Sequence, residues 1–361
     1  MEKLWHAEKC RTKKGEMMKQ IGILTAVALM ACSTASAQEP INFQGKQILM
    51  VIGYRAGGGT DIAGRMIAKH LGKHLPGQPT IVTQNIPGAD GMVALNYVVQ
   101  QTKPDGLTIT MGSGTQIDPL HARKAQAKYD ISKFNFVGGA GLGGTVLIIN
   151  KDAEKRILDK KGEPAIMGAL SGMPRSGMQM TAWGKEFLDW NVKWVVGYPG
   201  TNDLTVALER GEIDMTATGT IPLVEKLMKT GKFKILAQSG MMKDGAFVAR
   251  PEFGDAPIIG TKMVGKIKDP LAQKGFEYWS ALNMMDKWLA LPPDTPQPIV
   301  DVYRKAFQEM AKDPAYLETG SDYTPVSHKE IEKLVATLSA TPDDSLKYIS
   351  TMLRGQGLAV E

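Results

Sequence analysis

Residues 56–61 read Ala-Gly-Gly-Gly-Thr-Asp and stand between an apolar run and an amphipathic stretch, which predicts a loop between a strand and a helix. Glycines leave the backbone N–H groups uncovered, and the helix that follows adds the positive end of its dipole. Such a loop binds anions. Nucleotide-binding patterns do not fit, because a dinucleotide loop needs glycine where Ile62 stands, and a P-loop needs Lys and then Ser or Thr where Arg65 and Met66 stand. The alternative is a tight turn without a ligand.

Three other loops occupy comparable places in the pattern. Residues 112–116 (Gly-Ser-Gly-Thr-Gln) follow an expected strand, residues 171–177 precede an expected helix, and residues 198–201 (Tyr-Pro-Gly-Thr) follow another strand. The carboxyl ends of parallel strands share one sheet edge, so such loops converge on one crevice. Each loop alone is equally compatible with an ordinary turn, but the four together indicate a ligand site.

Groups that could perform catalysis are scarce in this sequence. Its histidines are His6, His70, His74, His121 and His328, and there is no G-x-S-x-G segment for a serine nucleophile. His70 and His74 lie one helical turn apart and could clamp a metal, although a solvated surface pair is the preferred interpretation. A glycine pattern at Gly139, Gly141 and Gly144 precedes a strand rather than a helix, which favours a hinge over a nucleotide loop. We therefore expect a binding site with no cofactor and no metal, and no enzymatic activity.

The composition indicates a packed globular protein. The 361 residues are 43% hydrophobic and 22% charged, a length that suggests two domains. The net charge is +6, but residues 1–37 hold six basic and three acidic side chains, so the rest of the chain carries only about +3. This is too weak a charge for a nucleic-acid surface, so nucleic acid is not an expected partner.

Residues 1–37 resemble a secretory signal peptide. Lys19 is followed by the apolar run 21–31 and by the small residues Ala35-Ser36-Ala37, which predicts cleavage before Gln38. We expect translation to start at Met17 or Met18, because the polar stretch before them has no role in a signal. In an alternative, residues 29–32 are a lipoprotein box and Cys32 carries a lipid anchor.

The two cysteines, Cys10 and Cys32, both fall within this leader. The exported form would therefore have no disulfide, no thiolate metal site and no cysteine nucleophile. After residue 37 no apolar run approaches the ~18 residues that span a bilayer. The sequence thus predicts a soluble periplasmic protein.

The expected elements alternate between strand and helix in two units. In the first unit, strands at 48–52, 80–83 and 107–111 alternate with helices at 62–71 and 89–100, which predicts a parallel, doubly wound sheet. A glycine-rich bridge at 138–144 leads to the second unit, with strands at 165–170, 193–196, 213–217 and 234–238 and helices at 177–188, 203–210 and 221–230. Two similar units imply a cleft. A polar section at 250–268 precedes a strand at 288–290, and helices at 299–310, 329–338 and 342–352 are expected to return to the first unit.

The sequence resembles the solute receptors of tripartite tricarboxylate transporters, the Bug-type periplasmic receptors. The resemblance lies in the order and spacing of short pieces along almost the whole mature chain: AGGGTD at 56–61, NIPGA at 85–89, PDG at 104–106, GYPG at 197–200, GEID at 211–214 and PPDTP at 292–296. It implies an α/β, two-lobed periplasmic binding protein type 2 fold (a Venus flytrap), with a doubly wound mixed sheet in each lobe. We expect residues 38–142 and 240–361 in lobe I and residues 143–239 in lobe II.

The resemblance also implies a function. A receptor of this family captures a small organic carboxylate in the interlobe cleft and delivers it to the permease subunits of a membrane transporter. The ligand is held by loop amides, small hydroxyl side chains and bridging waters. Two other functions stay open: an exported enzyme acting on a carboxylated metabolite, and a ligand-sensing co-receptor for a two-component system.

Three departures from the family pattern bear on the ligand. Arg55 stands where the family usually has proline, Ile86 replaces a basic residue, and residues 218–220 (Thr-Gly-Thr) stand near the family's usual aspartate. The solute need not be the usual one. We hypothesise that Arg55 or Arg175 makes a charge-assisted bond to a carboxylate.

The expected ligand-binding residues come from the four loops and their neighbours. Tyr54 and Tyr198 would wall the site, and Thr60, Ser113, Thr115, Ser171 and Ser176 would donate hydrogen bonds, with helix capping as the alternative role of the hydroxyls. Hinges are expected at 138–144 and 238–240. The full set is Tyr54, Arg55, Ala56, Gly57, Gly58, Gly59, Thr60, Asp61, Gly88, Ala89, Ser113, Gly114, Thr115, Gln116, Ser171, Arg175, Ser176, Tyr198, Pro199, Gly200, Thr218 and Thr220.

Overall fold

The computed structural model describes residues 40–141, 144–169, 176–198, 201–219, 221–243, 246–283, 285–319 and 324–358. The expected signal peptide at 1–37, the lipoprotein box and both proposed start sites lie outside the described residues. Among the residues described, no helix is both long and apolar enough to cross a membrane.

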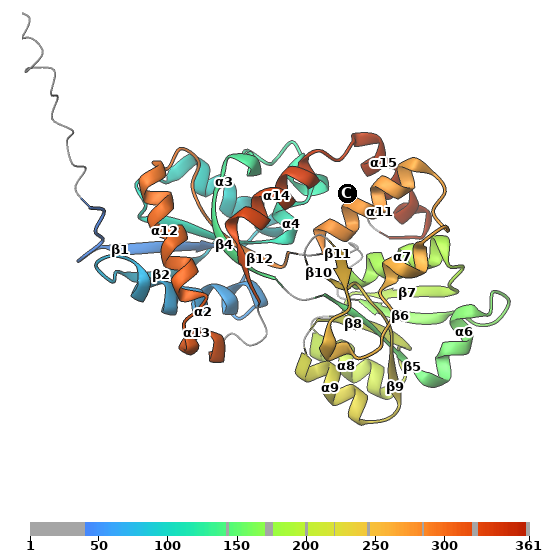
Figure 1. The fold of residues 1–361 in the computed structure, drawn as a ribbon. Helices are drawn as coiled ribbons and strands as arrows, with labels where there is room; N and C mark the ends of the chain where they lie inside the picture. The colour runs from blue at the N-terminus through green and yellow to red at the C-terminus, as the bar shows by residue number, and fades with distance from the viewer. Residues whose placement is uncertain are drawn as a thin grey trace, which may run out of the picture. The chain divides into compact units, whose positions relative to one another are not determined.

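The first sheet has six strands, in the order β13-β4-β12-β3-β1-β2 (Figure 1). β1 runs parallel to both β2 and β3, whereas β12 and β13 run antiparallel to their neighbours. The strands are β1 Gln47–Ile52, β2 Thr80–Asn85, β3 Thr108–Ser113, β4 Asn135–Gly141, β12 Lys287–Leu291 and β13 Thr324–Ser327. Its helices are α2 Gly59–His74, α3 Met92–Gln101, α4 Gly114–Ile117, α5 Pro119–Ala122, α12 Gln297–Met310, α13 Pro314–Thr319 and α14 His328–Ser339.

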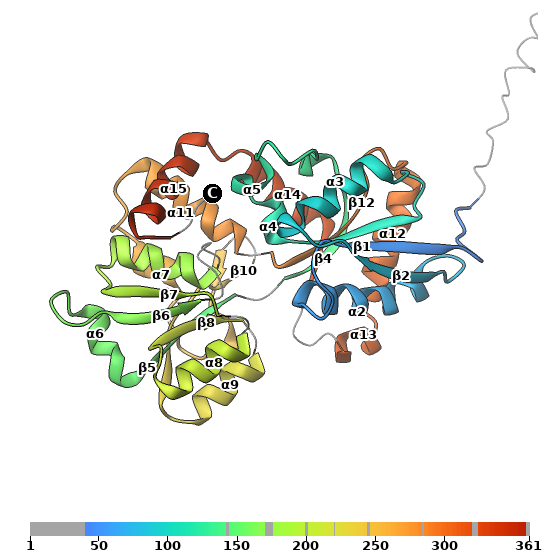
Figure 2. The ribbon, with the colours of Figure 1, turned by 180° about the vertical axis from the view of Figure 1, so that it is seen from behind.

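Alternation along β1 explains why helices cover both faces of this sheet. Met50 and Ile52 lie next to Gly64 of α2, whereas Val51 between them belongs to a buried cluster with Leu95 of α3. Successive side chains of a strand point to opposite faces, so a strand buried on both sides is apolar throughout. Helices α2 and α3 accordingly lie on opposite faces of the sheet (Figures 1 and 2). The parallel, doubly wound arrangement expected around β1 is confirmed.

The second sheet has five strands, in the order β7-β6-β8-β5-β9. β6 runs parallel to β7 and β8, and β5 runs antiparallel to β8 and β9. Its elements are β5 Val146–Asn150, α6 Glu154–Leu158, β6 Ala165–Ala169, α7 Ser176–Phe187, β7 Val192–Val196, α8 Thr201–Arg210, β8 Met215–Thr218, α9 Ile221–Lys229 and β9 Phe233–Gln238. The four strands and three helices expected between 165 and 238 are all present, and the two mixed sheets form a two-lobed α/β fold.

Two chain segments that leave β4 and β9 run side by side. The Ser239 N–H donates to the Thr145 carbonyl at 2.9 Å, and the Thr145 N–H donates to Ser239 Oγ at 2.9 Å. The expected hinge at 138–144 begins too early, because residues 138–141 belong to β4, which pairs with β12 and β13. A Cβ on Gly138 would lie 2.2 Å from the Phe307 ring, so this glycine permits close packing of α12. Hinge motion at Gly144 and at 238–240 stays a prediction.

Helix α11 (Pro270–Leu282) was not expected from the sequence. Asp269 caps it by accepting the Leu271 N–H at 2.8 Å, and Pro270 occupies its first turn, both of which are ordinary helix-start signals. It follows β10 Met241–Lys243, β11 Ala246–Val248 and α10 Ile259–Met263. The sequence predicts a polar section only to residue 268 and no element before the strand at 288–290, whereas the structure has a helix that includes the buried Trp279.

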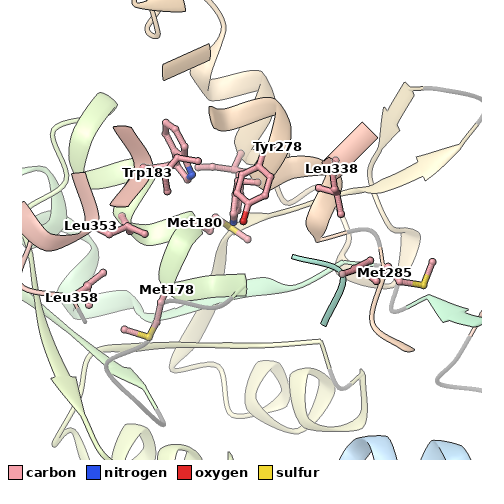
Figure 3. Close-up of a cluster of buried hydrophobic side chains, with 14 of the residues drawn as sticks. Met178, Met180, Trp183, Tyr278, Met285, Leu338, Leu353 and Leu358 are labelled. Atoms are coloured by element: carbon pink, nitrogen blue, oxygen red, sulfur yellow. The ribbon is translucent and has the colours of Figure 1, made fainter. Parts of the chain in front are cut away.

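The last helix, α15 (Asp343–Gly355), departs from the expectation that the C-terminal helices all return to the first unit. α12 and α14 do pack on β4. At the end of α15, by contrast, Gln356 accepts from Trp194 Nε1 of β7 at 3.0 Å and donates to the Ala182 carbonyl of α7 at 3.0 Å. Figure 3 shows Leu353 of α15 in one buried cluster with Trp183 of α7. The expectation holds only for the start of α15, where Asp343 pairs with Arg123 after α5, and is wrong for its end beside β7 and α7. The residue limits given for the two lobes stay predictions.

Candidate functional site

Three loops of the first sheet meet at one edge. β1, β2 and β3 are parallel neighbours, and Ile52 at the end of β1 pairs with Asn85 and with Met111. The segments that follow these strands, 53–58, 86–91 and 114–117, therefore begin at the same edge. The Ile86 N–H donates to the Ile52 carbonyl at 2.8 Å, which ties the second of these loops to the first.

Asp61 lies at the centre of a hydrogen-bond network that holds the glycine loop. Its carboxylate accepts the Gly57 N–H at 2.8 Å, Arg65 Nε at 2.9 and 3.0 Å, and Asn85 Nδ2 at 2.8 Å. The side chain is only 4% exposed. The Arg65 hydrogen bond, with those from Gly57 and Asn85, lowers the pKa of Asp61 to about 2. Asp61 is thus an ionised anchor of the loop whose two oxygens already have partners within the protein.

Tyr54 and Ser113 join the first loop to the third. The Tyr54 hydroxyl donates to the Asp90 carbonyl at 2.9 Å and lies 2.5 Å from Ser113 Oγ. Asn85 Nδ2 also donates to the Tyr54 carbonyl at 2.8 Å, so one amide group serves both Asp61 and Tyr54. Because Tyr54 directs its proton to Asp90, the hydrogen between the two hydroxyls comes from Ser113.

The loop amides divide into two groups. The Gly57 N–H is bound by Asp61, and the Gly58 N–H donates to the Arg55 carbonyl at 3.3 Å, so these two have partners inside the loop. The N–H groups of Gly59 and Thr60 belong to the first turn of α2, where an α-helix offers no acceptor. A Cβ built on Gly59 would meet no heavy atom within 4 Å, so space is open beside this turn. The open space beside the glycine loop therefore adjoins the first turn of α2.

The third loop, expected at residues 112–116, is wrong as a loop: residues 112–113 end β3 and residues 114–116 belong to the short helix α4. The Gly114 N–H donates to the Asp286 carbonyl at 3.0 Å. Gln116 is fully buried, accepts the Ser113 N–H at 2.7 Å and donates to the Gly91 carbonyl at 3.1 Å. Gln116 is thus an internal brace between the second and third loops.

The second sheet presents a corresponding edge. β6, β7 and β8 are parallel and end at Ala169, Val196 and Thr218. The N–H groups of Gly197 and Tyr198 both donate to the Ala169 carbonyl, at 3.1 and 3.3 Å. Thr218 is buried, and Tyr198 is half-buried against the core of this sheet.

The structure brings part of the expected set together. Tyr54, Gly57, Asp61 and Ser113 belong to one network, and Arg55, Ala56 and Gly58 are exposed beside it. Gly88 and Ala89 form the turn before α3, where both have positive φ, and Thr115 is half-buried in α4. Ser171, Arg175, Pro199, Gly200, Thr220 and the side chain of Ser176 lie outside the described residues.

Asn85, Arg65 and Asp90 were absent from the expected set. Arg65 carried a local signal, because it stands four residues after Asp61 on the same helix. Asn85 begins the 85–89 piece that contributed to the family resemblance. Asp90 contributes through its main-chain carbonyl, which no residue-type pattern reveals.

His70 and His74 hold a neighbouring helix. His70 Nε2 lies 3.2 Å from Thr319 Oγ1 of α13, and His74 Nε2 lies 3.1 Å from Asp313 Oδ2 just before α13. The preferred interpretation as a solvated pair was wrong, because His70 is only 3% exposed. Within the described ranges, no group of three or more His, Cys, Asp or Glu is placed to hold a metal ion.

Comparison with known proteins places the chain in a family. The family model "Tripartite tricarboxylate transporter family receptor" matches residues 63–338, well over half of the sequence. The chain belongs to this receptor family. A UPF0065 protein of Bordetella pertussis is 26% identical over 307 residues, which are 82% of this chain and 85% of that protein. The resemblance noted in the sequence is confirmed.

Solved structures related to this receptor share its fold. A TctC solute-binding protein from Polaromonas, solved without ligand, has a TM-score of 0.62 and 18% identity over 87% of this chain and all of its own. An R. palustris protein solved with adipate has a TM-score of 0.59 and 19% identity over 87% of this chain and 98% of its own. These similarities confirm the two-lobed periplasmic binding fold for the receptor described here.

Proposed function

We propose that the protein is an exported, non-enzymatic receptor that binds a small organic carboxylate in an interlobe cleft. It delivers this solute to the permease subunits of a tripartite tricarboxylate-type transporter. Membership of the receptor family supports solute binding, and the related protein with adipate supports a carboxylate. The periplasm is the compartment in which such a receptor works.

The start of α2 is the observation that carries this proposal. Its first turn adjoins open space at Gly59, although Thr60 beside it is buried, and Asp61 and Asn85 hold the loop that leads into this turn. A helix N-terminus favours a carboxylate through its N–H groups and its dipole together. A rigid loop also reduces the entropy lost when the ligand binds.

We assign roles to residues of the expected ligand-binding set from their hydrogen-bond partners and their exposure. Gly59 and Thr60 supply main-chain donors, Tyr54 and Ser113 form the adjoining polar wall, and Arg55 supplies an exposed positive charge at the rim. Asp61 positions the loop and does not touch the ligand, because its oxygens are used by Gly57, Arg65 and Asn85. Tyr198 and Thr218 stand at the equivalent edge of the second sheet.

A ligand screen tests the proposal. Mono-, di- and tricarboxylates, amino acids and aromatic acids are compared by thermal shift, with adipate included, and each hit is measured by calorimetry. We expect one class of acids to raise the unfolding midpoint by several degrees at concentrations well above Kd. Stabilisation by no acid of the panel would overturn carboxylate binding.

Two further measurements separate the transport role from its alternatives. NMR of the bound acid after long incubation should show it chemically unchanged, since conversion would identify an enzyme. Deletion of the gene should abolish uptake of that acid by the producing cell. Intact uptake combined with a lost transcriptional response would identify a sensing co-receptor instead.

A further inference from the structure

A turn between α10 and α11 displays an apolar side chain in solvent. Val264 is 80% exposed, the highest value among the exposed large apolar side chains of the described residues. The Lys266 N–H donates to the Met263 carbonyl at 3.0 Å, and Gly265 has φ +71°. These features, with φ −55° and ψ 124° at Val264, define a type II turn. The turn geometry needs the glycine but not a valine at its tip.

The turn is anchored on both sides. Ile259 and Met263 of α10 are 1% and 3% exposed, and Ile267 packs against the same buried cluster. The backbone that carries Val264 is therefore tied to the core at each end. An apolar side chain on such a turn is presented in one place and loses little backbone entropy when it meets a partner.

Basic side chains surround this tip. Lys262, Lys266 and Lys268 are exposed, and no ion pair within the described residues involves them. The nearest acid in sequence, Asp269, accepts the Leu271 N–H as the cap of α11. Residues 262–268, which we call the Val264 turn, thus combine a protruding apolar side chain with three exposed lysines and contain no acidic residue.

We propose that the Val264 turn is a docking element for the surface of a bilayer that contains anionic phospholipids. Val264 enters the interfacial layer, and the lysines contact lipid phosphates. A lipid surface suits this turn better than a protein surface, because a specific protein interface needs about 20–30 residues on each side. A short basic loop with one apolar tip needs no shape complementarity, and its attraction to anionic lipid grows with each lysine.

The consequence is weak and reversible residence at the membrane. Such residence would keep a receptor near the plane of its permease while its ligand-binding residues, which lie on other loops, stay free. The inference does not depend on ligand binding by the α2 loop. The two proposals can therefore fail separately.

Vesicle sedimentation tests this inference. The full chain is mixed with vesicles of equal parts phosphatidylglycerol and phosphatidylcholine, and with vesicles of phosphatidylcholine alone. All variants carry the same residues 1–41, so any lipid affinity of that segment cancels in the comparison. We expect preferential binding to the anionic vesicles, weakened roughly tenfold or more by Lys262→Gln, Lys266→Gln and Lys268→Gln together, and severalfold by Val264→Ser.

Control variants with the same changes of charge and of side chain at other surface positions test whether the effect is specific to the Val264 turn. Lys69→Gln, Lys103→Gln and Lys193→Gln remove the same total charge from exposed lysines elsewhere, and Val206→Ser changes another exposed valine, which is 42% exposed on α8. These controls should leave vesicle binding within about twofold of wild type, and added salt should weaken wild-type binding. Equal affinity for both vesicle types, or equal losses in the controls, would overturn the proposal. Loss of cellular uptake without any vesicle binding would assign the turn to a protein partner and also overturn it.

Discussion

The hydroxyl of Tyr54 lies 2.5 Å from Ser113 Oγ, although 59 residues separate the two in the chain. Tyr54 follows β1, and Ser113 ends β3, which is the parallel neighbour of β1. The contact joins the glycine loop to the third loop at the sheet edge. The contact therefore fixes the side chain of Tyr54, which directly precedes the glycine loop.

Removal of either hydroxyl should lower the stability of the protein. Tyr54→Phe loses the bonds to Asp90 and Ser113, and Ser113→Ala loses the bond to Tyr54. A hydrogen bond of this kind contributes about 1 kcal/mol, so Ser113→Ala should be destabilised by about 1 kcal/mol and Tyr54→Phe, which loses two bonds, by about 2 kcal/mol. In a double-mutant cycle measured by denaturant unfolding, the two losses should be coupled by at least ~0.5 kcal/mol. Strict additivity would show that the contact contributes nothing.

Asp61→Asn should disorder the glycine loop. The amide removes the charge that holds Arg65 and leaves one fewer acceptor for Gly57 and Asn85. Because Arg65 is half exposed, we expect a loss of roughly 1–2 kcal/mol rather than that of a fully buried pair. Ligand affinity should fall about tenfold. Unchanged affinity would refute the positioning role.

The lowered pKa of the Asp61 carboxyl should make the stability of the protein depend on pH in acid. Its pKa is lowered from 3.8 to about 2 in the folded protein, so its contribution is present above pH 3.8 and lost as the pH falls toward 2. Asp61→Asn should remove this part of the slope in unfolding experiments between these two pH values. A variant with the wild-type slope would mean that other carboxyls account for it.

Arg55→Gln should reduce affinity for a carboxylate by about tenfold, because a charge-assisted hydrogen bond contributes about 1.5–3 kcal/mol and the site is partly screened. The loop should survive, since Gly58 bonds to the Arg55 carbonyl and not to its side chain. Calorimetry at low and high salt would measure the effect. Lys103→Gln is the charge-matched control, and equal affinity of both variants for every bound acid would dismiss Arg55.

Two glycines in the first turns of helices should behave differently when changed to alanine. A Cβ on Gly177 would lie 1.9 Å from the Ala217 Cβ, so Gly177→Ala should cost about 1–3 kcal/mol. A Cβ on Gly59 meets nothing within 4 Å, so Gly59→Ala should leave the unfolding midpoint unchanged or slightly raised. Gly59→Ala should still lower ligand affinity at least ~tenfold, because the methyl group occupies space beside the donors. Retained affinity would place the ligand elsewhere.

The lowered pKa of His70 should make the folded protein less stable on mild acidification. Burial, with the nearby charges of Lys73 and Lys69, lowers its pKa below the usual 6.5, against a smaller opposite effect of Asp313. The unfolded state therefore binds the proton more readily, and stability falls as the pH drops below 6.5. His70→Gln should flatten the dependence of the unfolding midpoint between pH 7 and pH 5. An unaltered dependence would point to His328, whose pKa burial also lowers.

Most of the strand and helix pattern follows from short-range features of the chain. The run of apolar residues in β1, the glycine loop and the first turns of α2 could be assigned from a few neighbouring residues each, because the periods of strand and helix are local. α11 is not predicted although its Asp269-Pro270 start is a standard signal, because it follows directly on the polar section at 250–268. β13 was not expected, since four residues carry too little periodic information.

The sequence by itself determined the two alternating units and the family, and it predicted an anion-binding loop at residues 56–61. Tertiary structure alone decided that Asp61 is bound within the protein, that Tyr54 meets Ser113, and that α15 packs beside β7. The physical reason is distance along the chain. Local periodicity states which face of an element is apolar, but the partner of a buried polar group depends on which strands become neighbours and in what register.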